Sequence, residues 1–289
     1  MSGLARFIAG GTVLTDGAWG TELQARGLEP GDCPDLWNLR HPDRVREVAA
    51  AYVAAGSRVV LTNTFRSNAV TLAGHGMAGR AAELNRRGVE LSREAAAGKA
   101  FVFASIGPSG KMLLTGETSE DELMAAFGEQ ALAHAEAGAD ALLIETMSDI
   151  AEASIALRAA QPTRLPVIVS FAFDTGRNKD RTMMGSTPED CARAMADAGA
   201  DGVGANCGVG IDEAVALCRR MRAACDLPLW MKPNAGLPEV VDGVAVYRTA
   251  AEAFAGKAPD LIAAGAAFVG GCCGSNPAFI RAIAGVVAP

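Results

Sequence analysis

The stretch "DAGADGVGANC", residues 197–207, shows the design from which the fold can be inferred. An alanine-rich helical segment ends at Gly199, and a short run of small and apolar residues follows it directly. A glycine after a helix commonly takes the left-handed conformation that ends the helix. A short run that is apolar without alternation is typical of a parallel strand buried on both faces. The stretch therefore predicts a helix that leads into a strand of a parallel sheet.

Three further stretches repeat this design, namely "AAGSRVVLTNTF" at 54–65, "EAGADALLIET" at 136–146 and "AAGAAFVGGCC" at 263–273. The pivotal glycines of the four stretches are Gly56, Gly138, Gly199 and Gly265, which are 82, 61 and 66 residues apart. One strand with its helix takes about 30 residues, so each interval has room for a further strand.

The intervals contain suitable segments: "AFVFASIGP" from Ala100, "LPVIVSFAF" from Leu165 and "LPLWMKPNAG" from Leu227, and "GTVLTDG" from Gly11 precedes the first repeat. Eight strands, each followed by helical sequence, predict a single (β/α)₈ TIM barrel that takes residues 1–289 as one domain. A doubly wound open sheet is the alternative. It is disfavoured because no Gly-x-Gly-x-x-Gly pattern opens a helix after the first strand.

Helix start signals agree with this division of the chain. Pro42 suits the first turn of a helix, Ser119 with Glu122 forms a capping-box pattern, and Thr187-Pro188 precedes another helical segment. We expect helices to begin at these three places.

Composition narrows the class of function. The 289 residues carry a net charge of −7 and no long run of Lys or Arg, which disfavours a nucleic-acid or anionic-membrane surface. No segment reaches about 18 uninterrupted apolar residues. We therefore expect a cytoplasmic protein that acts on small molecules. In that reducing compartment the seven unevenly spaced cysteines favour metal or catalytic roles over disulfides.

The barrel hypothesis predicts which residues meet, because barrel enzymes build their sites at the carboxyl ends of the strands. The residues at these ends are Asp16, Gly17, Thr62, Asn63, Thr64, Ser105, Glu145, Asn206, Cys207, Lys232, Asn234, Cys272 and Cys273. Three of the seven cysteines are among them.

Cys207, Cys272 and Cys273 together predict a metal site. Strands six and eight have the same parity, so their ends should lie close across the mouth of the barrel. Three thiolates suit Zn²⁺, and they leave a fourth position open, as in catalytic zinc sites. The alternative is that the three cysteines are small buried packing residues.

The other cysteines and the histidines are given no role. Cys218 and Cys225 lie on one face of a predicted helix and are expected to pack there. His41, His75 and His134 fall in loop or helix positions and are taken as surface or incidental residues, which makes a histidine-ligated metal improbable.

The chain resembles the zinc-dependent homocysteine S-methyltransferase family through its motifs "TDGAWGTEL", "LTNTF", "IETMSD", "GANCGVG" and "GGCCG", in that order from about Thr12 to Asn276. The family includes betaine–homocysteine methyltransferase, S-methylmethionine–homocysteine methyltransferase and the homocysteine-binding barrel of cobalamin-dependent methionine synthase. The pairing of "GANC" with "GGCCG" is the specific part of the resemblance.

The resemblance implies an S-methyltransferase that moves a methyl group from an activated donor to homocysteine and forms methionine. It implies that Cys207, Cys272 and Cys273 bind the zinc cofactor and that the substrate thiol takes the open position. It further implies that Asp16 and Glu145 receive the amino group of homocysteine, while Gly17 and Thr62 help to hold its carboxylate. Asn234 is a possible pocket residue.

The methyl donor is left open. Trp37 could face a cationic onium donor, or it could be a buried anchor for its loop. The segment "LTNTFRSNAVTLAGHG" is more similar to the methionine-synthase barrel, which favours a methylcorrinoid donor carried by a separate protein. The alternative function is thus one subunit of a split corrinoid-dependent system.

Two further alternatives remain. One is a protein that binds zinc and homocysteine without catalysis. The other is a metal-free, aldolase-like barrel that uses Lys232 as a Schiff-base amine.

Overall fold

The computed structural model describes residues 3–237, 239–241 and 244–287. Its principal sheet has eight parallel strands in the order β1-β10-β7-β6-β5-β4-β3-β2. Their bounds are β1 Val13–Leu14, β2 Val59–Val60, β3 Phe101–Ile106, β4 Ala141–Met147, β5 Val167–Phe171, β6 Gly202–Asn206, β7 Leu229–Lys232 and β10 Ala266–Val269. Seven of the eight segments expected from the sequence contain one of these strands whole, and β4 runs one residue past its segment, to Met147.

The sheet curls into a nearly closed barrel. The backbone N–H of Arg58 donates to Leu14 O at 2.8 Å, which joins the residue before β2 to the end of β1. The predicted (β/α)₈ barrel is thereby confirmed, and the open doubly wound sheet is not the fold.

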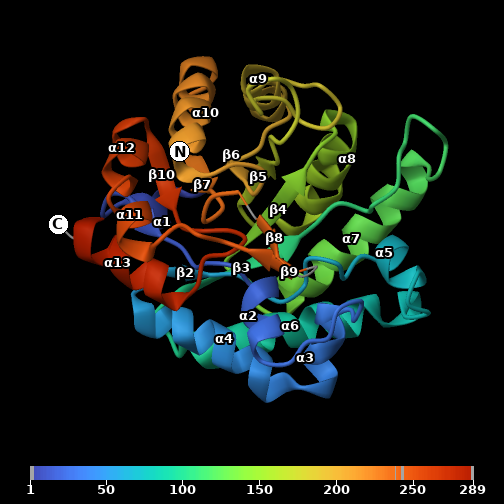
Figure 1. Ribbon diagram of the computed structural model, residues 1–289. Helices are drawn as coiled ribbons and strands as arrows, with labels where there is room; N and C mark the ends of the chain where they lie inside the picture. The colour runs from blue at the N-terminus through green and yellow to red at the C-terminus, as the bar shows by residue number, and fades with distance from the viewer. Residues whose placement is uncertain (1–2, 238, 242–243, 288–289) are drawn as a thin grey trace.

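Helices surround the strands, as Figure 1 shows. The larger ones are α4 Pro42–Ala55, α6 Ala81–Ala96, α7 Glu120–Glu136, α8 Ile150–Ala160, α9 Pro188–Asp197, α10 Ile211–Ala224 and α13 Pro277–Val287. Shorter ones are α1 Ala5–Ile8, α2 Gly20–Ala25, α3 Trp37–Arg40, α5 Ala69–Ala73, α11 Ala251–Ala255 and α12 Ala258–Ala263, with 3-10 turns at Pro34–Leu36, Ala78–Arg80 and Gln161–Thr163. No helix in the described part of the chain is both long and apolar enough to cross a bilayer.

The helix starts and stops follow the expected chemistry. Pro42 opens α4, the Ser119 side chain accepts the N–H of Glu122, and Thr187 forms a complete capping box with Asp190. The four pivotal glycines have φ values of 109° at Gly56, 87° at Gly138, 85° at Gly199 and 108° at Gly265. These left-handed conformations are ones that glycine adopts without the cost imposed by a side chain.

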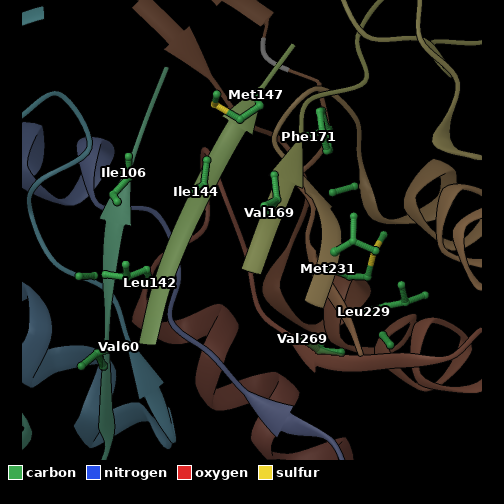
Figure 2. Packing of buried hydrophobic residues seen from close by; sticks show 14 of the residues in the cluster. Val60, Ile106, Leu142, Ile144, Met147, Val169, Phe171, Leu229, Met231 and Val269 are labelled. Carbon is green, nitrogen blue, oxygen red and sulfur yellow. The ribbon is translucent and has the colours of Figure 1, made fainter. Parts of the chain in front are cut away.

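Alternate strand residues pack on opposite sides of the barrel wall. Residues such as Val60, Leu142 and Met231 pack in the outer layer between strands and helices, part of which Figure 2 shows. Their neighbours in sequence form a separate inner cluster, which includes Leu143 and Trp230.

Aromatic rings fill the barrel interior. The rings of Phe103, Trp230 and Phe268 have centroids 5.3 to 6.0 Å apart. Leu4 and Phe7, from the segment around α1, belong to the same cluster. The interior is therefore a packed core, and the space for a ligand lies at one end of it.

A small antiparallel hairpin, β8 Glu239–Val241 with β9 Val244–Val246, leaves the barrel after β7. Figure 1 shows it in orange, across the centre of the ring of strands.

Candidate metal and substrate site

Three thiols converge at the carboxyl ends of two strands. Cys207 directly follows β6, and Cys272 and Cys273 follow β10 after two glycines. All three Sγ atoms lie within 4.8 Å of one another, and those of Cys207 and Cys273 are 3.6 Å apart. Sulfur ligands about 2.3 Å from a tetrahedral zinc ion would be roughly 3.8 Å apart. The spacing of the sulfurs therefore fits a zinc ion held by three thiolates.

Backbone hydrogen bonds hold the three cysteines in place. Cys272 N donates to Pro233 O at 2.7 Å, and Ala235 N donates to Cys273 O at 2.9 Å. Cys207 has a φ of 62°, in the left-handed region that non-glycine residues seldom occupy. Such conformations cost energy and persist where the surroundings impose them, often at functional sites.

The metal-free thiols are poor acids. Hydrogen bonding to Cys272 lowers the pKa of Cys207, but the contact with Cys273 and burial outweigh it and raise the pKa to about 11. The pKa of Cys273 is likewise raised, to about 12. Without a metal the protonated thiols are favoured. A bound divalent cation would favour the thiolates instead, because metal ligation requires the thiolate.

A buried ion pair lies beside the sulfurs. Lys232, the last residue of β7, places Nζ 2.5 Å from Asp16 Oδ1. The other carboxylate oxygen of Asp16 accepts the N–H of Leu61 at 2.7 Å and the indole N–H of Trp19 at 2.8 Å. Burial lowers the pKa of Lys232, but Asp16 and Glu145 outweigh burial, so the pKa is raised. Lys232 is thus held as a cation, which is the opposite of what a Schiff-base nucleophile requires.

Glu145 is the second carboxylate of the site. The hydroxyl of Ser105 donates to Glu145 Oε1 at 2.5 Å, and the amide of Asn206 approaches Oε2 at 3.5 Å. Asn206 also donates to Thr146 Oγ1 at 2.7 Å and accepts the N–H of Thr146 at 2.9 Å, so it fixes the part of β4 that carries Glu145. Burial raises the pKa of Glu145 and Lys232 opposes that rise.

A cavity of about 400 Å³ opens over these groups. Its wall includes Gly17, Trp19, Asp35, Thr62, Asn63, Arg66, Ser105, Glu145, Thr146, Cys207, Lys232, Cys272 and Cys273. The volume suits a small molecule. Six of the eight residues predicted for the site, Gly17, Thr62, Glu145, Cys207, Cys272 and Cys273, thus line one cavity.

The other two predicted residues lie off the cavity wall. Asp16 is fully buried and is reached through its contacts with Lys232 and Trp19. Asn234 is buried, and its Oδ1 has no hydrogen-bond partner among the described residues. Their roles in substrate binding stay predictions.

Gly17 and Thr62 both line the cavity, Gly17 where there is no room for a side chain and Thr62 through a hydrogen-bonded hydroxyl. A Cβ atom on Gly17 would lie 2.7 Å from the Tyr52 hydroxyl and 2.9 Å from Ser275 Oγ, so only glycine fits. The Thr62 hydroxyl is 2.6 Å from that of Thr64 and accepts the N–H of Ser105 at 3.0 Å.

Sequence analysis missed two contacts of Asp16, namely those with Lys232 and Trp19. Lys232 was considered only as a catalytic amine, although a lysine at a strand end beside two carboxylates could have indicated an ion pair. The bond from Trp19 to Asp16 carries no sequence signal.

Asp35 was also missed. This buried carboxylate lines the cavity and accepts from the N–H of Arg66 at 2.9 Å and the hydroxyl of Ser67 at 2.6 Å. Burial raises its pKa to about 6.

One expectation about residues away from the site needs correction, and the structure decides between two open alternatives for another residue. His134 is a fully buried residue of α7 whose ring nitrogens have no partner among the described residues, so it is no surface histidine. Trp37 is 4% exposed and contacts His41 and Arg44, which supports the alternative of a buried anchor over that of a residue facing a donor. Cys218 is a buried residue of α10, as expected. Cys225 is half-buried and lies just after the last residue of that helix.

Comparison with known proteins gives one family. Residues 13–287 match the family model described as homocysteine S-methyltransferase. The chain is 33% identical to methionine synthase of Mycobacterium tuberculosis and 31% identical to that of Mycobacterium leprae, over 96% and 99% of its own length. It spans about a quarter of the length of these two relatives.

Among solved structures, the homocysteine methyltransferase MmuM from Escherichia coli is similar over nearly the whole of both chains. Its oxidized form is 25% identical and its metallated form 26% identical, each with a TM-score of 0.81. These matches cover 99% and 98% of the present chain, and 100% and 99% of the MmuM chain, respectively.

Proposed function

Because the chain belongs to the homocysteine S-methyltransferase family, we propose that it transfers a methyl group from an activated donor to the thiol of homocysteine in a zinc-dependent reaction that yields methionine. The observation that carries the proposal is the group of three sulfurs, 4.8 Å or less apart, on the wall of a cavity that also presents Glu145. That the MmuM relative has been solved in a metallated form supports metal binding by this chain.

Cys207, Cys272 and Cys273 would hold the zinc ion. Three soft sulfur donors favour zinc over the hard cations magnesium and calcium, and three protein ligands leave a position for a substrate thiol. The chemistry that zinc supplies when bound is to lower the pKa of a coordinated thiol, which favours the nucleophilic thiolate.

The charges around the cavity suit an amino acid. Asp16 and Glu145 as carboxylates and Lys232 as a cation give a net charge of −1, which the ammonium group of homocysteine would neutralise. Glu145 lines the cavity and is the direct candidate for that contact, while Asp16 acts through Lys232. We place the substrate carboxylate near Gly17 and Thr62, which line the same cavity.

With the amino acid held in this way, its sulfur would face the remaining space of the cavity. Methyl transfer then requires the donor's methyl carbon in line with that sulfur, so that the new S–C bond forms as the donor leaves with its bonding electron pair. Holding both reactants in one cavity lowers the entropic cost of the reaction.

The methyl group has two candidate sources, a small-molecule donor and a separate methylcorrinoid protein. The alignment with the whole chain of MmuM, a homocysteine methyltransferase, supports homocysteine as the acceptor, and a small-molecule methyl donor is the first candidate. The alignment with a quarter of two methionine synthases favours the alternative, in which a separate methylcorrinoid protein supplies the methyl group. A cytoplasmic location stays a prediction from the sequence.

The test is a methionine-formation assay on the reduced protein with homocysteine and, in turn, S-methylmethionine, betaine and a methylcorrinoid protein. We expect methionine with one donor, and loss of activity in Cys273→Ser. Cys225→Ser, which changes a cysteine outside the cavity, is the control that should keep activity. Zinc and homocysteine binding without turnover of any donor would favour the non-catalytic alternative.

A further inference from the structure

A bulge in β4 turns two consecutive residues toward the cavity. The pairing of β4 with β5 keeps its register up to Ile144 and resumes at Met147, so Glu145 and Thr146 lie opposite a single residue of β5. Ile144 and Met147 both pack in the outer layer (Figure 2), although residues three positions apart in a regular strand point to opposite faces. Bulges redirect side chains in this way next to active sites. Glu145 and Thr146 consequently both line the cavity.

Asn206 holds Thr146 in an unusual backbone conformation. Thr146 has a φ of 61°, in the left-handed region that β-branched residues rarely adopt. Its N–H donates to Asn206 Oδ1 at 2.9 Å, and the hydroxyl of Ser170 donates to the same oxygen at 2.6 Å. Such conformations persist where the surroundings impose them, and they are frequent at ligand-binding sites. These bonds therefore hold the Thr146 side chain at the cavity wall.

The hydrogen bonds of Asn206 determine where the hydroxyl proton of Thr146 can go. A backbone N–H can only donate, so the amide atom that faces Thr146 N is the oxygen Oδ1. The other amide atom, Nδ2, is then the donor that lies 2.7 Å from Thr146 Oγ1. The Thr146 hydroxyl accepts this bond, and within the described ranges of the chain it makes no bond as a donor. Its proton is therefore available to a ligand in the cavity.

The hydroxyl proton of Thr62, in contrast, is already engaged. Thr64 donates its hydroxyl proton to Ser105 O at 2.7 Å. In the 2.6 Å contact between the two threonine hydroxyls, Thr62 is therefore the donor. Thr62 also accepts the N–H of Ser105 at 3.0 Å. A substrate carboxylate near Thr62 consequently needs a hydroxyl donor from another residue.

We propose that Thr146 is a substrate-binding residue whose hydroxyl donates a hydrogen bond to the carboxylate of homocysteine. This inference rests on the proposed function. Homocysteine carries its ammonium and its carboxylate on one carbon atom, so a donor beside the acceptor of the ammonium suits the carboxylate. Glu145, the direct candidate for the ammonium, precedes Thr146 in the chain and lines the same cavity. A carboxylate accepts several hydrogen bonds, so a further contact near Gly17 is compatible with this one.

The test compares two thiols, homocysteine and aminopropanethiol, which is homocysteine without its carboxylate. Isothermal titration measures the affinity of the reduced, zinc-loaded protein for each thiol. Thr146→Val keeps the shape and the β-branch of the side chain but lacks the hydroxyl. We expect this variant to bind homocysteine about 10- to 100-fold more weakly, the cost of a hydrogen bond to a charged group, and to bind aminopropanethiol as the unmodified protein does.

Thr146→Ser is the matched control. It keeps the hydroxyl and can still accept from Asn206, so it should bind homocysteine about as tightly as the unmodified protein. Zinc content and circular dichroism check that each variant holds its metal and is folded.

Equal affinities of Thr146→Val and the unmodified protein for homocysteine would overturn the role of Thr146 and leave the proposed function standing. A loss of affinity that is equally large for both thiols would also overturn it, because the hydroxyl would then act only through Asn206 and Glu145. An unmodified protein that binds neither thiol would overturn the proposed function and this inference with it.

Discussion

Lys232 and Asp16 form an ion pair inside the protein, with Nζ 2.5 Å from Oδ1 and side chains that are 3% and 0% exposed. They join the end of β7 to the end of β1. Asp16 also accepts the N–H of Leu61, which follows β2, at the place where the barrel closes. One carboxylate therefore ties together three strand ends beneath the cavity.

We predict that Lys232→Met lowers the free energy of unfolding by about 3–5 kcal/mol at pH 7, because it leaves Asp16 charged and buried without its partner. The double variant Asp16→Asn/Lys232→Met should recover most of this loss, since the asparagine still accepts from Leu61. Urea unfolding measures both. A loss below about 1 kcal/mol in the single variant would show that the pair contributes little.

Glu145 should make homocysteine binding depend on pH. Burial raises the pKa of this carboxyl above its usual value, so the carboxylate that would contact the substrate ammonium is lost at a higher pH than for an exposed glutamate. Affinity should therefore weaken as pH falls. Glu145→Gln should bind homocysteine about 10- to 100-fold more weakly at pH 7.5, the cost of a hydrogen bond to a charged group.

Isothermal titration across pH checks this prediction. Any pH dependence that remains in Glu145→Gln belongs to other groups, such as the thiols and Asp35, which also line the cavity. Equal affinities of this variant and the unmodified protein would remove Glu145 from the substrate contacts.

Asp35 should make the protein less stable as pH rises from about 4 to about 6. Its pKa is about 6 in the folded protein against 3.8 when unfolded, so the native state holds the proton more tightly and burying the carboxylate costs about 3 kcal/mol above this window. Asp35→Asn keeps the acceptor for Arg66 and Ser67. The variant should therefore be up to about 3 kcal/mol more stable at pH 7 and equal to the unmodified protein near pH 3.5.

Chemical unfolding at several pH values measures the difference. Asp32→Asn changes an exposed carboxylate of the same loop and serves as the control that should not alter stability. A variant Asp35→Asn that is less stable at pH 7 would mean that the charge itself is needed.

His134 should make the protein less stable as pH falls, which is opposite to the effect of Asp35. Burial lowers its pKa from 6.5 to about 3, so the unfolded chain binds a proton that the folded protein excludes. Its contribution to stability is complete above pH 6.5 and is lost as pH falls, by about 2 kcal/mol between pH 6.5 and pH 5.

Between pH 6.5 and pH 5, His134→Leu should lose less free energy of unfolding than the unmodified protein does. His75→Leu changes an exposed histidine and should lose as much as the unmodified protein. Parallel curves for His134→Leu and the unmodified protein would show that His134 is hydrated in solution.

The sequence was informative where local chemistry decides the structure. The glycine after a helix, followed by a short apolar run, predicted the helix stop at Gly199 and the strand ending at Asn206. This pattern located four strands, and the intervals between its copies, together with apolar segments in them and before the first copy, located the other four. Because the parallel strands of a barrel all end on one face, the same pattern also predicted that Cys207 lies close to Cys272 and Cys273.

The features that escaped prediction depend on the register of distant segments. The pair of Lys232 and Asp16 joins residues 216 positions apart, and no local pattern specifies it. The hairpin after β7 did carry a signal, because the dipeptide Asp242-Gly243 between two Val-rich runs is typical of a tight turn; these two residues lie outside the described part of the chain. The burial of His134 follows from packing of α7 and has no counterpart in its sequence neighbourhood.

The most direct test of the account is the zinc content of the reduced protein by elemental analysis, alone and in Cys207→Ser, Cys272→Ser and the control Cys225→Ser. We expect about one zinc per chain in the unmodified protein and the control, and the loss or marked weakening of zinc binding in the other two variants. Reduced protein that contains no zinc and takes none up would contradict the three-thiolate site and the methyl-transfer mechanism built on it.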